Sequence, residues 1–257
     1  MKIGIALSGG GSRGIAHIGM LKALEEFDIH PDIISGSSAG SIIGALYAYG
    51  YKPEEILGIV QKTKLFQILR PAFTRSGLLT LEKTYDFFNS LLPTDSFDSL
   101  KIPMYICATN VNNGRSTFFS SGSLIRSVMA SSAIPVIFSP VEIDNKQYID
   151  GGITNNLPID PLIGHCNKII GLHCNPVDEE YDTGNMKKLL ERTFLIAING
   201  NVENRKKNCD LFLEPYELKK YGAFDFAKSK EMFEIGYRYA LENEAMIKTI
   251  KDSGQTV

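Results

Sequence analysis

Short apolar runs alternate with segments of helical periodicity over the first fifty residues of the chain. Residues 3–8 and 33–35 are apolar runs flanked by glycine or proline, which is typical of short buried strands. Residues 15–27 carry apolar side chains three and four positions apart, and residues 39–49 are rich in small and apolar side chains, so both segments are predicted helices. Strand, helix, strand and helix at this spacing predict a parallel sheet with helices packed on its faces.

The remainder of the chain continues this alternation. The turn Asn112-Asn113-Gly114 is predicted to join the strands on either side of it. No repeat, low-complexity tract or linker divides the sequence, so we expect one domain over residues 1–257, a three-layer α/β/α sandwich with a mainly parallel central sheet. Further helices are predicted at residues 53–69, 79–92, 123–129, from 186 onward and at 228–250, and further strands at 104–108, 117–119, 136–143, 147–149, 168–173 and 210–213.

Composition and charge agree with an ordinary globular protein. Of the 257 residues, 44% are hydrophobic and 22% are charged, which supplies a packed core and excludes disorder as the main state. The 27 Lys and Arg residues against 29 Asp and Glu residues give a net charge of -2. This balance predicts no basic face, so we expect no nucleic-acid partner.

Cysteines and apolar windows bear on the cellular compartment. Cys107, Cys166, Cys174 and Cys209 form no C-x-x-C pair, and reduced thiols in a cytoplasm are expected. The apolar run near the N-terminus is too short for the core of a signal peptide. The longest uncharged window, residues 33–51, holds four serines and four glycines, so it is rejected as a membrane span. We expect a soluble cytoplasmic protein that can contact a membrane surface transiently from outside.

The first predicted strand and helix are joined by the run Gly9-Gly10-Gly11-Ser12-Arg13-Gly14. This run fits G-x-G-x-x-G, but the nearby carboxylate, Asp32, lies at the wrong end of the second strand for a dinucleotide ribose. Glycines before a helix expose backbone N–H groups to an anion, either a phosphate or the oxyanion of an acyl-transfer intermediate. A tight turn without a ligand is the alternative.

The second strand and helix are joined by the run Gly36-Ser37-Ser38-Ala39-Gly40. It matches G-x-S-x-G, the nucleophile elbow, in which a sharp turn strains the serine and aims its hydroxyl outward over the helix N-terminus. The helix dipole at that end favours a developing negative charge. The strand–turn–helix context favours a nucleophile over a glycine-rich turn with a spectator serine.

A carboxylate follows the predicted strand at residues 147–149. The run Asp150-Gly151-Gly152 can present carboxylate oxygens into a cleft at the strand end. An ordinary Asp-Gly turn is the alternative interpretation of the same residues.

Taken together, these motifs resemble the patatin-like phospholipase family, in its small bacterial members. The resemblance covers roughly residues 2–175 and implies a lipid acyl hydrolase that needs no metal and no cofactor. Fatty-acyl phospholipid or lysophospholipid is the implied substrate class. The matching positions are residues 9–14 with Ile-Ala-His-Ile-Gly at 15–19, residues 36–40, residues 130–135, and residues 150–152 with Asn156 and Pro158 beyond them.

The resemblance also implies roles for individual residues. Ser38 would be the nucleophile that forms an acyl-enzyme, and Asp150 would be its general base. The amides of Gly10 and Gly11, with that of Ala39 as an addition, would form the oxyanion hole. Arg13 would either face a headgroup or brace the glycine loop through a backbone carbonyl, and bracing is favoured. The supporting motif positions are Gly9, Ser12, Arg13, Gly14, Gly36, Gly40, Gly151 and Gly152.

Alternatives to this assignment stay open. A Ser–acid–His triad could use His165 or His173. These two histidines each precede a cysteine, but their spacing matches no common zinc pattern, and His17 is expected to pack within a helix. Residues 53–92 either pack on the sheet or form a mobile cover over an acyl-chain groove. A lipid-binding or regulatory protein with little activity is the alternative to an enzyme.

Overall fold

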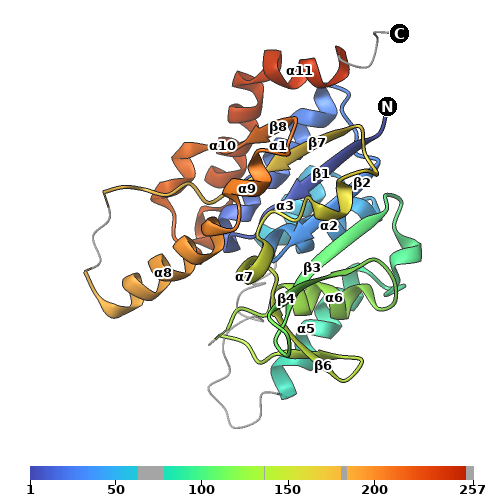
Figure 1. The fold of residues 1–257 in the computed structure, drawn as a ribbon, viewed down its shortest axis with the longest axis vertical. Helices are drawn as coiled ribbons and strands as arrows, with labels where there is room; N and C mark the ends of the chain where they lie inside the picture. The colour runs from blue at the N-terminus through green and yellow to red at the C-terminus, as the bar shows by residue number, and fades with distance from the viewer. Residues whose placement is uncertain (63–77, 136, 181–183, 253–257) are drawn as a thin grey trace.

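The computed structural model describes residues 1–62, 78–135, 137–180 and 184–252 (Figure 1). Its centre is an eight-stranded sheet in the order β5-β6-β3-β2-β1-β7-β8, with β4 paired to β3. Strands β3, β2, β1, β7 and β8 run parallel to one another, whereas β4 and β6 pair antiparallel with β3, and β5 pairs antiparallel with β6. The strands are β1 (Ile3–Leu7), β2 (Ile33–Ser37), β3 (Met104–Asn110), β4 (Arg115–Phe119), β5 (Val141–Ile143), β6 (Lys146–Asp150), β7 (Lys168–Leu172) and β8 (Leu211–Leu213).

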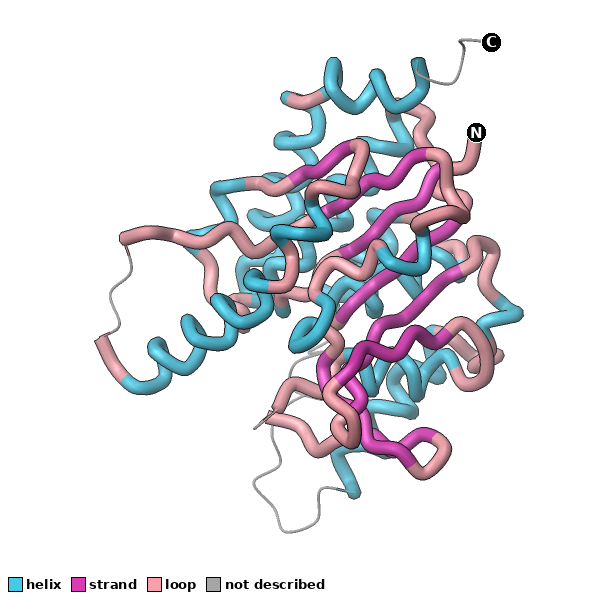
Figure 2. Tube along the Cα trace, viewed as in Figure 1, coloured by secondary structure: helices cyan, strands magenta, loops and turns pink. Residues whose placement is uncertain are grey.

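Helices flank the sheet on both faces (Figure 2). In the view of Figure 1, α1, α2 and α3 lie behind the strands, and α7 and α9 lie in front of them. Helix α10 packs along α1, which ties the C-terminal part of the chain to the first helix. The helices are α1 (Ile15–Glu26), α2 (Ala39–Tyr49), α3 (Pro53–Lys62), α5 (Leu78–Leu91), α6 (Leu124–Ser131), α7 (Gly152–Asn155), α8 (Met186–Gly200), α9 (Glu203–Lys206), α10 (Ser229–Glu242) and α11 (Glu244–Asp252).

The central strands bury both of their faces. Successive side chains of a strand point to opposite sides, so Ile5 and Leu7 join the large core beneath α1 and α2, while Ala6 joins a smaller cluster on the other side. The smaller cluster includes Leu157, next to α7, and Val202, next to α9. This two-sided burial explains why the central strands are continuous apolar runs in the sequence.

Most predicted elements are confirmed, and two boundaries are wrong. The strand predicted at 136–143 begins only at Val141. Val136 lies outside the described residues, and Phe138 donates its backbone N–H to the Ile134 carbonyl at 2.9 Å instead of pairing in the sheet. The last helix, predicted as one segment, is divided at Asn243, whose side chain donates to the carbonyl of Tyr239 at 2.7 Å and caps α10.

Residues 53–92, expected either to pack on the sheet or to form a mobile cover, lie partly outside the described residues. Helix α3 packs on α1 and α10, and α5 packs on α6. No helix in the described part of the chain is both long and apolar enough to cross a bilayer.

Candidate active site

The turn between β2 and α2 holds Ser38 in a strained conformation. Its φ is 50° and its ψ is -123°, a region that costs a non-glycine residue about 1–3 kcal/mol. Two hydrogen bonds link the turn to α6 and β3. The Ser38 N–H donates to the Ser131 hydroxyl at 2.9 Å, and that hydroxyl donates to the Cys107 carbonyl at 2.6 Å. Such strain, retained by specific contacts, is the expected property of a nucleophile elbow.

Glycines in this elbow permit a close approach of helix α2 to the sheet. A Cβ added at Gly40 would lie 2.2 Å from the carbonyl oxygen of Leu7, on β1. A Cβ added at Gly36 would lie 2.5 Å from the carbonyl oxygen of Gly40. Both glycines of G-x-S-x-G are therefore required by packing, because any side chain would push α2 off β1 and β2.

The glycine loop after β1 is fastened by residues far away in the sequence. The Asn175 side chain donates to the Gly9 carbonyl at 2.5 Å, and the Ala223 carbonyl accepts the Ser12 N–H at 2.9 Å. Arg13 donates from Nε to the Tyr221 carbonyl at 2.7 Å, which is the bracing role favoured from the sequence. The chain after β7 and the segment before α10 together fix the shape of this loop.

Three backbone N–H groups around Ser38 make no hydrogen bond to any described residue. They belong to Gly10, Gly11 and Ala39. Gly11 has φ of 59°, and a Cβ there would lie 2.3 Å from the Ala223 carbonyl oxygen, so the loop conformation requires glycine. Ala39 is the first residue of α2, where the helix dipole also favours negative charge. These amides are therefore suited to receive an anionic oxygen.

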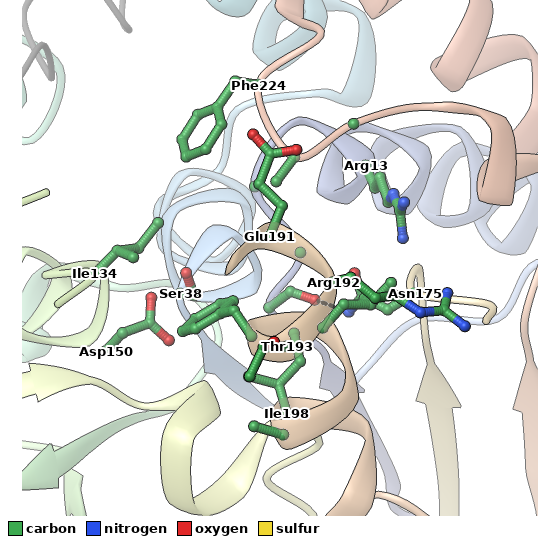
Figure 3. Close-up of a pocket in the computed structure, with 18 of the residues that line it drawn as sticks. Arg13, Ser38, Ile134, Asp150, Asn175, Glu191, Arg192, Thr193, Ile198 and Phe224 are labelled. Carbon is green, nitrogen blue, oxygen red and sulfur yellow. Dashed lines mark hydrogen bonds between the residues drawn. The ribbon is translucent and has the colours of Figure 1, made fainter. Parts of the chain in front are cut away.

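Asp150 ends β6 and faces Ser38 (Figure 3). The backbone fixes it: its N–H donates to the Ala133 carbonyl at 2.9 Å, and its Oδ1 accepts the Gly152 N–H at 2.8 Å. Its Oδ2 has no hydrogen-bond partner among the described residues. Figure 3 nevertheless shows the two side chains pointing toward one another.

The environment of Asp150 makes it a stronger base than an ordinary aspartate. Burial raises the pKa of the carboxyl to about 6, although the nearby Ser38 hydroxyl and the Gly152 N–H offset part of that rise. Only 2% of Asp150 and 6% of Ser38 is exposed. A carboxylate with this pKa is charged at neutral pH and can still accept a proton.

A cavity of about 610 Å³ opens above Ser38 and Asp150. Its walls are mainly apolar: Ile134 follows helix α6, Ile153 lies on α7, and Phe194 and Ile198 lie on α8. Leu190 of α8 lines the cavity and is exposed to solvent, and Met186, Leu189 and Ile196 are exposed elsewhere on the same helix. The site thus combines a strained serine and a buried carboxyl with an apolar space of a size that suits an acyl chain.

The structure brings the predicted residues together in two groups. The cavity is lined by Gly9, Gly10, Gly11, Arg13, Ser38 and Asp150. The remaining predicted positions shape the turns behind it: Ser12, Gly14, Gly36, Ala39, Gly40, Gly151 and Gly152.

The histidines of the alternative triad lie elsewhere. Neither His165 nor His173 lines the cavity. His173 instead contacts Glu214 through Nδ1 at 2.6 Å. His17 is fully buried behind the glycine loop, and burial lowers its pKa to about 4, so it is a neutral packing residue as expected. Within the described ranges, His, Cys, Asp and Glu side chains form no cluster of three or more that could hold a metal ion.

Most of the cavity wall was not predicted from the sequence. Helix α8 was predicted as a helix, but nothing in its periodicity indicated that it borders the site. Asn175 follows an ordinary apolar strand, and its contact with Gly9 spans 166 positions of the chain. Asn156 was noted only as part of a motif, yet it is one of the residues that line the cavity, and its Oδ1 lies near Asp150. Only the Asn156 position carried a local signal that could have found it.

Comparisons with known proteins agree with this geometry. A family profile described as patatin-like phospholipase matches residues 5–163. An uncharacterised NTE family protein of Mycobacterium tuberculosis is 34% identical over 166 residues, which cover 63% of this chain and 46% of that protein. Lysophospholipase NTE1 of Scheffersomyces stipitis is 27% identical over 271 residues, covering 93% of this chain and 18% of that protein. The chain thus spans less than half the length of these relatives.

A solved structure shares the fold. The crystal structure of VipD from Legionella pneumophila superposes with a TM-score of 0.61 at 14% sequence identity, covering 96% of this chain and 67% of VipD. The mixed sheet flanked by helices and the strained turn at Ser38 are consistent with the family that the profile match indicates. The chain therefore belongs to the patatin-like phospholipase family.

Proposed function

We propose that this protein hydrolyses carboxylic esters of lipids, with Ser38 as the nucleophile and Asp150 as the general base. One observation carries the proposal: a strained serine and a buried carboxyl with a pKa raised to about 6 face one another at the floor of an apolar cavity. The arrangement supplies a nucleophile, a base and oxyanion donors from the protein itself.

In the first half-reaction, Asp150 accepts the hydroxyl proton as the Ser38 oxygen attacks the ester carbonyl carbon. The carbonyl π electrons move to the oxygen, and the amides of Gly10, Gly11 and Ala39 stabilise the oxyanion. Removal of one such donor costs about 2.7–4 kcal/mol in a comparable site. When the carbon–oxygen bond to the alcohol breaks, the proton passes from Asp150 to the leaving oxygen, and the acyl-enzyme remains.

In the second half-reaction, water repeats these steps. Asp150 accepts a proton from water, the resulting hydroxide attacks the acyl carbonyl, and Ser38 leaves with the proton. One base therefore serves both half-reactions. This requires a carboxyl that is charged in the free enzyme and that accepts a proton readily during each half-reaction. The raised pKa of Asp150 meets both requirements.

Phospholipid or lysophospholipid is the proposed substrate class. Relatives that are named lysophospholipases support it, and so does the apolar cavity. Transient contact with a membrane surface agrees with the exposed apolar side chains of α8, which include Leu190 at the cavity. We further propose that residues 1–257 act as one domain, because the sheet and the α1–α10 packing join the two ends of the sequence.

Release of fatty acid from a lysophospholipid tests the proposal. We expect turnover by the wild type, and loss of at least about 1000-fold in kcat for Ser38→Ala and for Asp150→Asn. His173→Ala should keep its turnover, because that side chain lies outside the cavity. A folded wild type that binds the lipid without releasing fatty acid would favour the lipid-binding alternative.

A further inference from the structure

The side chain of Asn156 is buried without any partner for its polar atoms. It is fully inaccessible to solvent, and neither Oδ1 nor Nδ2 makes a hydrogen bond to a described residue. A buried carboxamide normally has its donors and acceptors satisfied, because leaving them unmade costs free energy. The fold therefore keeps a destabilising group at this position.

This carboxamide lies among the reactive groups. Asn156 is one of the residues that line the cavity of Ser38 and Asp150. A Cβ added at Gly9 would lie 2.6 Å from Asn156 Oδ1 and 2.9 Å from Ser38 Cβ. A Cβ added at Gly152 would lie 2.8 Å from the same Oδ1 and 3.0 Å from the Asp150 carboxylate. Asn156 Oδ1 thus occupies the corner between the nucleophile, the base and the glycine loop, and the unpartnered donor Nδ2 is bonded to the same carboxamide carbon.

The backbone of Asn156 makes hydrogen bonds within the fold, whereas its side chain makes none to a described residue. The Asn156 N–H donates to the Asn201 side chain at 2.7 Å, and its carbonyl accepts the Gly9 N–H at 3.3 Å. Both contacts would survive a change of side chain. The neighbouring Asn155 differs: it is equally buried, but its Nδ2 donates to Asp160 at 2.7 Å, and it does not line the cavity.

We propose that Asn156 is a further catalytic residue, whose carboxamide N–H donates a hydrogen bond to an oxygen of the reacting ester. This inference rests on the proposed function. Two ester oxygens gain negative charge in turn, the carbonyl oxygen during attack by Ser38 and the leaving oxygen as its bond to carbon breaks. A donor fixed in a buried corner stabilises such charge strongly, because it needs no reorganisation when the charge develops.

Asn156→Leu tests the role, because leucine has a similar volume and no polar atoms. With a medium-chain p-nitrophenyl ester as the probe, we expect kcat to fall about 100-fold while KM stays within about threefold. The melting temperature should stay equal or rise, since an unsatisfied group is removed. Asn156→Ala provides the same test if leucine does not fit.

Asn155→Leu is the matched control. It loses the hydrogen bond to Asp160, so we expect a lower melting temperature and kcat within about threefold of the wild type. If wild type turns over the probe and Asn156→Leu keeps kcat within about twofold, the inference is wrong and the proposed function stands. If the folded wild type neither turns over the probe nor reacts with a fluorophosphonate, the proposed function fails and the inference with it.

Discussion

Replacement of Asp150 by Asn should remove activity and stabilise the protein at the same time. The carboxyl is buried, and burial raises its pKa from 3.8 to about 6. Between these two values the folded protein holds a proton that the unfolded chain has released. The free energy of unfolding therefore falls as the pH rises through this window, and the loss is complete above the folded pKa. Asparagine carries no charge at any of these pH values and avoids that loss.

The magnitude follows from the two pKa values. At about 1.4 kcal/mol per pKa unit, the difference between 3.8 and about 6 amounts to about 3 kcal/mol. The amide oxygen of the substituted side chain can still accept the Gly152 N–H, which the carboxyl accepts at 2.8 Å. We expect Asp150→Asn to exceed the wild type in unfolding free energy by about 3 kcal/mol at about pH 8 and to equal it below about pH 4.

Urea unfolding at about pH 4, 6 and 8 measures this difference. Asp28→Asn is the control, because Asp28 is exposed and its pKa is lowered by Lys251, so this variant should gain no stability at the highest pH. An Asp150→Asn protein that is no more stable than wild type at the highest pH would refute the account of Asp150 as a base destabilised by burial. An advantage of equal size at the lowest pH would refute its electrostatic origin.

Three further predictions concern activity and packing. The kcat/KM of the wild type should fall about tenfold for each pH unit below about 6, because protonated Asp150 cannot act as a base; a profile flat down to about pH 4.5 would contradict this. Ser131→Ala should lower kcat about tenfold, measured beside Ser132→Ala as the control, since it removes the acceptor of the Ser38 N–H. Gly40→Ala should cost about 1–3 kcal/mol in a thermal melt, because the new methyl group meets the Leu7 carbonyl.

The sequence predicted the parts of this molecule that depend on local structure. The strands and helices around Ser38 follow from apolar runs and from glycines that a sharp turn requires, and α2 was predicted with both ends correct. The Asp150 turn was likewise visible as a carboxylate at a strand end. Such features are predictable because neighbouring residues in the chain determine them.

The rest of the site depends on contacts between distant residues. Asn175 reaches the Gly9 carbonyl over 166 positions of the chain, and Arg13 reaches the Tyr221 carbonyl over 208. Helix α8 forms one wall of the cavity through side chains that are typical of an ordinary amphipathic helix. Tertiary packing alone decides these placements, so no periodicity in the sequence could reveal them. The strand that begins at Val141 was predicted to start too early because the residues before it include apolar ones that are also typical of a strand.

The central claim is that Ser38 is an activated nucleophile. The most direct measurement is the intact mass of the protein after treatment with a fluorophosphonate, for the wild type, Ser38→Ala and Ser41→Ala, whose hydroxyl donates to the Ser38 carbonyl at 2.7 Å in the wild type. The account predicts a single adduct on the wild type and on Ser41→Ala and none on Ser38→Ala. A folded wild type without an adduct, or an equal adduct on Ser38→Ala, would contradict it.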